Sequence, residues 1–171
     1  DNGQGEEALR RLPGVEAAHP EPARLLLLVG QALDESREAG AAAQILERSL
    51  ALDPSRAETR LALGRALFDA GRTADAIPHL RAALDAGFRP ETAAFALVQA
   101  LAATGQAEEA AARLERLSLP PRTDAASLLV VGNTALQLRR PDLALRFLDR
   151  GIAQDPRAAA LREKRGLALV M

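Results

Sequence analysis

The feature that most constrains the fold of this chain is a repeat of 34 residues. Glycines recur in this register, with Val98 in the one slot that lacks a glycine: Gly30, Gly64, Gly132 and Gly166. Alanines follow twelve positions after the first four slots, with one more a period upstream: Ala8, Ala42, Ala76, Ala110 and Ala144. Leucines come four residues after each alanine: Leu12, Leu46, Leu80, Leu114 and Leu148. A single register therefore runs through the whole chain.

A helix–turn–helix unit explains why these residues recur. Small residues belong where two helices cross closely, and a leucine four residues later on the same helix face fills the space beside the crossing. The first helix carries apolar residues at helical intervals, as in residues 63–70, and Gly71 or Gly105 then permits a left-handed turn. The second helix ends where proline blocks it, at Pro20, Pro54 or Pro156.

This pattern resembles the tetratricopeptide repeat, which has Leu-Gly in its first helix, Ala followed by an aromatic residue or Leu in its second, and Pro at its close. The resemblance implies an all-α fold, a right-handed superhelical solenoid of four full repeats with a half repeat at each end. We expect a single domain over residues 1–171. Its parts are the second helix of a partial repeat (1–22), full repeats at 23–56, 57–90, 91–124 and 125–158, and a terminal or capping helix (159–171).

Two segments depart from the pattern. Pro78 lies about one turn into a second helix, where it is tolerated if the N–H that it lacks would have been unpaired, and otherwise bends the helix slightly. Leu117 stands where the other units have small residues, and the sequence "SLPPRT" ends that second helix early. We expect an altered superhelical twist between the third and fourth units.

In the resembled family, the first helices line a concave surface on which peptides lie, and this implies a groove in the present chain. Its apolar row is Leu27, Leu61, Phe95 and Leu129, and its polar row is Gln31, Arg65, Gln99 and Asn133. Leu28, Ala62, Ala96 and Val130 lie beside them. For each position, the alternative is core packing or solvated surface. The side chains with which chaperone-binding members clamp a carboxyl terminus are missing, so a chaperone-tail adaptor is disfavoured.

Composition and isolated residues argue against several other functions. The net charge is −1, and Arg65 is the only cation in the groove, which disfavours nucleic acid as a partner. The chain has no Cys, Trp or Tyr, and its longest apolar run, residues 25–29, is too short to span a membrane. We interpret His19, His79 and the pair Glu108–Glu109 as surface or satisfied groups, and Gly3–Gly5 as too short for a phosphate loop. We therefore predict no catalytic residue, metal ion or cofactor.

The sequence thus predicts a non-enzymatic scaffold that binds a peptide or protein segment in its concave groove. Two alternatives stay open: the substrate-recognition arm of a larger enzyme, such as a glycosyltransferase with amino-terminal repeats, and a self-association module that forms homo-oligomers through its unpaired terminal helices. We expect Arg162 and Arg165 to cap the array, and the apolar last turn to mark a fragment of a longer protein. Its composition suggests a bacterial source, with either a cytoplasmic or a periplasmic location.

Overall fold

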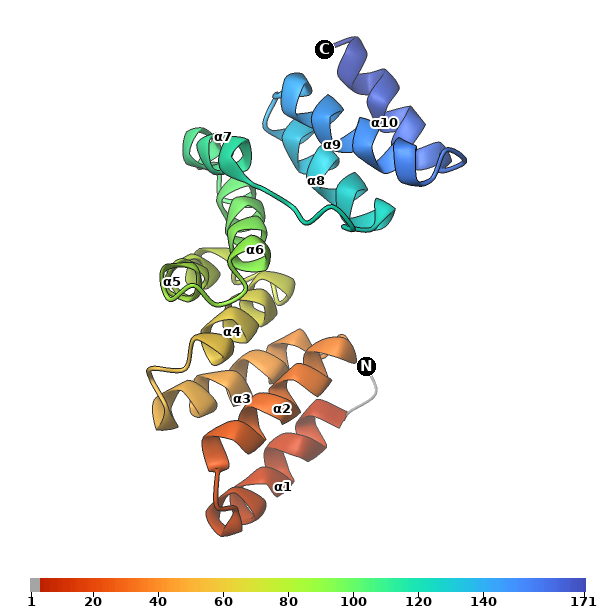
Figure 1. Ribbon diagram of the computed structural model, residues 1–171. Coiled ribbons are helices and arrows are strands. Elements are labelled where there is room, and N and C mark those ends of the chain that lie inside the picture. Colours follow the sequence, from red (N-terminus) through yellow and green to blue (C-terminus); the bar gives the residue numbers. More distant parts are fainter. Residues whose placement is uncertain (1–3) are drawn as a thin grey trace. The chain divides into compact units, whose positions relative to one another are not determined.

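The computed structural model describes residues 4–171, which form ten helices and contain no strand (Figure 1). Residues 1–3, the start of the predicted partial repeat, lie outside this description. The helices are α1 (Gln4–Ala18), α2 (Pro22–Glu35), α3 (Ala39–Leu52), α4 (Ala57–Asp69), α5 (Thr73–Asp85), α6 (Pro90–Ala103), α7 (Ala107–Arg116), α8 (Ala125–Gln137), α9 (Pro141–Gln154) and α10 (Ala159–Leu169). The all-α helical-repeat fold expected from the sequence is confirmed. No helix in this part of the chain combines the length and apolar character that a membrane crossing requires.

The helices group into two compact units, Asp1–Ala96 and Leu97–Met171, and the boundary falls inside α6. In the first unit α2 packs against α3 and α4 against α5, while α3 joins the two pairs by packing against α4. Helix α1 lies against both α2 and α3. In the second unit α8 packs against α9, which in turn packs against α10. A single array over residues 1–171 stays a prediction.

Three helix pairs, α2–α3, α4–α5 and α8–α9, are held by a leucine that packs directly on a glycine. Gly64 in α4 lies so close to α5 that a Cβ atom there would be 2.6 Å from Cγ of Leu80. The same contact joins Gly30 to Leu46 and Gly132 to Leu148. All three leucines are at most 1% exposed, so they cannot move aside into solvent. The repeated glycines and leucines therefore mark the tightest contacts between paired helices, as the register predicts.

The turn inside each unit has one backbone conformation whatever residue occupies it. Gly71 and Gly105 have φ near +80°, as predicted, and Arg37 and Arg139 occupy the same left-handed region at φ 64° and 55°. The N–H of the following residue donates to a carbonyl five residues back, for example from Arg72 to Leu67. These bonds satisfy the last carbonyls of each first helix. The sequence pointed only to the two glycines, because arginine carries no signal for this conformation.

Pro78 lies within the second helix α5, as predicted, but the first of the two alternatives given for it does not hold. It is the sixth residue of that helix, beyond the first turn, so the N–H that it lacks would have been paired. The helix nevertheless continues to Asp85. Packing of its buried residues Ala76, Leu80 and Ala83 maintains the helix across the missing hydrogen bond.

Helix α7 ends at Arg116, four residues before Pro120, as the sequence "SLPPRT" predicts. Two arginines of α9 bind the carbonyl groups that this early end exposes. Arg146 donates to the carbonyls of Leu114 and Glu115 at 3.1 and 3.2 Å, and more weakly to that of Leu117. One turn further along α9, Arg150 donates to the carbonyls of Leu119 and Pro120. We call this set of bonds the arginine clasp.

Replacing Gly64 with alanine is expected to lower the free energy of unfolding by about 1–3 kcal/mol, because the new methyl group overlaps Leu80 in a filled core. Gly166 is the matched control, since it occupies the same register position and a Cβ there would meet nothing within 4 Å. Gly166→Ala should gain about 0.5–1 kcal/mol from helix propensity alone. Urea unfolding followed by circular dichroism measures both changes. A Gly64→Ala variant as stable as the parent would contradict the close crossing.

Replacing Arg146 with alanine is expected to cost about 1–2 kcal/mol, because the carbonyl of Glu115 loses its arginine donor and that of Leu114 keeps only the backbone N–H of Leu117. Arg146→Lys should recover only part of this loss, since an ammonium group cannot match the fork of a guanidinium. Arg116→Ala is the control, because Arg116 is exposed and forms no ion pair or hydrogen bond with another side chain within residues 4–171. Equal unfolding midpoints for Arg146→Ala and Arg116→Ala would show that the clasp adds nothing to stability.

Candidate functional site

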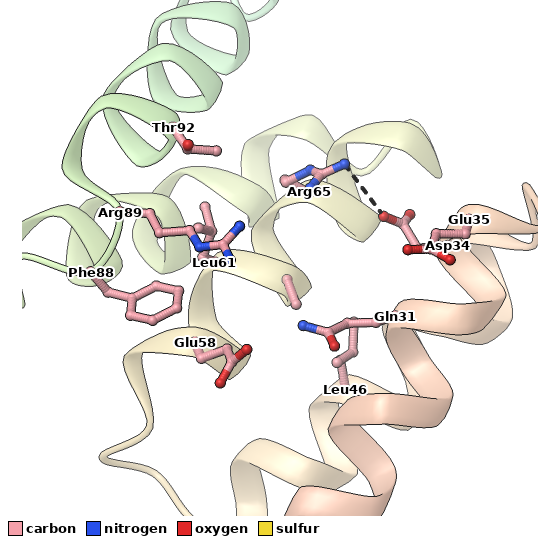
Figure 2. A pocket seen from close by; sticks show the side chains of 11 residues that line it. Gln31, Asp34, Glu35, Leu46, Glu58, Leu61, Arg65, Phe88, Arg89 and Thr92 are labelled. Carbon is pink, nitrogen blue, oxygen red and sulfur yellow. Dashed lines mark ion pairs between the residues drawn. The ribbon is translucent and has the colours of Figure 1, made fainter. Parts of the chain in front are cut away.

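A pocket of about 310 Å³ opens in the first unit between α2, α4 and the start of α6. Figure 2 shows its side chains, which come from these helices, from Leu46 of α3 and from the loop before α6, around a common space. The lining consists of Gln31, Asp34, Glu35, Leu46, Glu58, Leu61, Ala62, Arg65, Phe88, Arg89 and Thr92. Apolar, amide and charged groups of both signs therefore share one surface.

The repeat register explains why α2 and α4 direct polar groups here. Gly30 and Gly64 face the leucines of their own second helices. The next residue is rotated by roughly 100° around a helix, which turns Gln31 and Arg65 away from that contact. Both side chains line the pocket. The close crossing that stabilises the α2–α3 and α4–α5 pairs thus also fixes where the adjacent polar side chain lies.

Asp34 is a charged group of the pocket whose side chain is mostly buried. Its side chain is 15% exposed, whereas that of Arg65 opposite is 55% exposed. Nη2 of Arg65 lies 3.9 Å from Oδ2 of Asp34, too far for a hydrogen bond (Figure 2). Burial raises the pKa of Asp34 above its usual value; Arg65 opposes this rise, and the charges of Asp69 and Glu35 add to it. The Oδ1 atom is buried and has no hydrogen-bond partner among the described residues.

The third wall comes from the loop before α6. Gly87 has φ +70° and Arg89 φ +41°, and this backbone path brings Phe88 and Arg89 to the pocket. The guanidinium carbon of Arg89 lies 5.9 Å from the centre of the Phe88 ring. This arrangement is a cation–π contact at an exposed site. The wall thus offers an aromatic face that already lies beside a cation.

Three of the predicted groove residues, Gln31, Leu61 and Arg65, line this pocket. Leu61 is only 5% exposed and contributes part of the apolar floor, while Leu27 is 2% exposed and belongs to the core. The other four lie outside this pocket and are half-buried: Phe95 and Gln99 in α6, and Leu129 and Asn133 in α8. Their role in a groove stays a prediction.

Seven pocket residues were neither in the predicted groove rows nor beside them: Asp34, Glu35, Leu46, Glu58, Phe88, Arg89 and Thr92. Asp34 and Glu58 each lie three positions from a predicted groove residue, so helical spacing could have indicated both. Phe88 and Arg89 depend on a loop conformation that no periodic pattern encodes.

The two histidines do not form a metal site, and no group of three or more potential ligands occurs within residues 4–171. Nδ1 of His19 accepts a hydrogen bond from the backbone N–H of Glu21 at 3.1 Å. His79 in α5 is half-buried, and its Nδ1 has no partner in the described part of the chain. Burial lowers the pKa of His79, and the nearby Arg60 lowers it further. The expectation that each histidine is a surface or satisfied group thus holds for His19, which is exposed and hydrogen-bonded, and is wrong for the buried Nδ1 of half-buried His79.

Solved structures with this architecture include three that extend over most of the chain. The MamA protein is 21% identical with a TM-score of 0.71, and the match covers 89% of this chain and 83% of that one. YrrB, described as a TPR protein with an unusual peptide-binding site, is 19% identical with a TM-score of 0.71 and coverages of 96% and 84%. TTC0263, a thermophilic TPR protein of Thermus thermophilus, is 17% identical with a TM-score of 0.66 and coverages of 99% and 92%. At these identities the likeness shows the fold. A search of curated protein sequences gave no match.

Matches to family models give stronger evidence of the protein family than the structural similarity does. One model described as tetratricopeptide repeat matches residues 35–91 and 67–131, and a second with the same description matches residues 1–57 and 131–171. Each covers more than half of the chain, and their matches overlap or adjoin along its length. With the glycine, alanine and leucine register and the paired helices described above, these matches show that the chain belongs to the tetratricopeptide repeat family.

Proposed function

We propose that this protein is a non-enzymatic scaffold that binds a peptide segment of a partner in the pocket between α2, α4 and α6. Tetratricopeptide repeats are protein–protein interaction scaffolds, which sets the general class of function. The observation that carries the proposal is the convergence of Gln31, Leu61 and Arg65 from two successive first helices on one pocket. YrrB, which has a similar fold, is described as having a peptide-binding site.

The chemistry of the pocket suits a peptide. Gln31 forms no hydrogen bond with another group in residues 4–171 through its amide, which can both donate to and accept from a peptide backbone. Leu61, Ala62 and Phe88 supply apolar surface for a side chain of the partner. The charged groups of the pocket then discriminate between partner segments according to the charges that those segments carry.

A double variant, Gln31→Ala with Ala62→Leu, is expected to weaken peptide binding by about tenfold or more. The first change removes the free amide, and the second fills part of the pocket with a larger side chain. Ala62 is half-buried and helical, so the substitution leaves the helix pair intact. Peptides selected from a random displayed library supply the ligands, and isothermal titration measures their affinity.

Gln44→Ala is the matched control, because Gln44 is exposed on the second helix α3 and does not line the pocket. Its affinity should equal that of the parent, and circular dichroism should show all variants folded. Leu61 is unsuitable for a charge substitution because it is buried. Selected peptides that bind the double variant as tightly as the parent would refute binding in this pocket.

A further inference from the structure

The acidic groups of the pocket are less well compensated than its basic groups, and this asymmetry bears on what the pocket binds. Asp34 is mostly buried, its Oδ1 is unpaired within the described residues, and its only ion pair there is the long one with Arg65. A buried carboxylate loses hydration that only a close donor can replace. In contrast, Arg65 and Arg89 are exposed and keep much of their hydration. A ligand cation therefore gains more here than a ligand anion.

The position of Asp34 in its helix is a second, independent indication that its negative charge is poorly compensated. Asp34 and Glu35 are the last two residues of α2, where the ends of the backbone dipoles carry partial negative charge. Carboxylates there are unfavourable for the helix, whereas an arginine or lysine would be favourable. Both the burial and the helix position of Asp34 therefore lower the stability of the folded chain.

A second carboxylate faces the pocket from α4. Glu58 is half-buried and forms no ion pair in the part of the chain that the structure describes. Figure 2 shows Gln31, Asp34 and Glu58 arranged around the same space, with Gln31 and Asp34 from α2 and Glu58 from α4. Together they present carboxylate oxygens and an amide oxygen, which are acceptors for a multidentate donor such as guanidinium.

The remaining walls suit the rest of a long basic side chain. Leu61 and Ala62 offer apolar surface for its methylene groups, and the Phe88 ring already lies beside the guanidinium of Arg89. Basic side chains commonly bury their stems on apolar surface while the charged end reaches polar groups.

From these observations we propose that the pocket binds a partner segment through an inserted arginine or lysine side chain, with its charged end between Asp34 and Glu58 and its stem against Leu61 and Phe88. This inference rests on the proposed function, since it names the class of peptide that the same pocket takes. Arginine is the better ligand of the two, because its planar group can bond two acceptors and stack on an aromatic ring.

The experiment selects peptides on the whole chain from a random library and then varies both sides of the contact. We expect enrichment of arginine and lysine beside an apolar residue. Replacing the selected arginine by citrulline, which keeps its shape without the charge, should weaken binding by about tenfold or more. Glu58→Gln and Asp34→Asn should each cause a similar loss.

Two matched controls separate this loss from general charge effects. Glu108→Gln alters an exposed glutamate in the first turn of α7, the equivalent helix position to Glu58, and Asp85→Asn alters an exposed aspartate at the end of α5. Neither should change the affinity. Asp34→Asn should also raise Tm by about 2–4 °C, because it removes a buried charge, so its loss of binding cannot come from unfolding.

The outcomes distinguish the two proposals. Peptides that lose affinity in the Gln31→Ala, Ala62→Leu variant but carry no basic residue, or bind Glu58→Gln unchanged, would overturn the inference and leave peptide binding in the pocket intact. Failure to obtain any peptide whose binding depends on the pocket would overturn both. Loss of affinity with citrulline, Glu58→Gln and Asp34→Asn, but not with the two controls, would support both.

Discussion

Three helix pairs of the structure, α2–α3, α4–α5 and α8–α9, depend on the contact between a glycine in the first helix and a leucine in the second. Where Leu46, Leu80 and Leu148 lie on their glycines, the two backbones come closer than any side chain would allow. This contact fixes the rotation of both helices, because only one face of the first helix can approach so closely. The outward direction of Gln31 and Arg65 follows from that rotation. Core packing and pocket geometry thus have a common cause.

Much of the fold could be predicted because the residues that control packing recur at one spacing. A glycine, an alanine and a leucine in fixed register define the helix pair, and prolines mark most of the ends. The left-handed turns at Arg37 and Arg139 could not be predicted, since their conformation is imposed by the flanking helices and not by residue type. In the sequence, Arg146 likewise has no feature that distinguishes it from a surface residue. Its role is seen only in the structure, where the end of α7 lies beside it.

The pocket was predictable only in part, and for a similar reason. Gln31 and Arg65 follow from the register, because each comes directly after a glycine of known orientation. The burial of Asp34 depends on α4, which brings Arg65 and Asp69 near it. Natural sequences break local rules mainly at functional sites. A carboxylate that is buried, poorly paired and at the wrong end of a helix breaks three such rules at one position.

The arginine clasp has a consequence for how the segment after α7 can change. Arg146 and Arg150 bind main-chain carbonyls, which every residue type possesses, and they touch no side-chain acceptor in residues 117–121. The hydrogen bonds of the clasp therefore depend on the path of this segment and not on its side chains, although Leu117 is buried in the core. Exposed positions such as Ser118 can accept new side chains without loss of these bonds, whereas deletion of a residue there would displace the carbonyls of Leu119 and Pro120 from Arg150. The early end of α7 thus creates a segment in which exposed side chains can change, while the backbone path must stay the same.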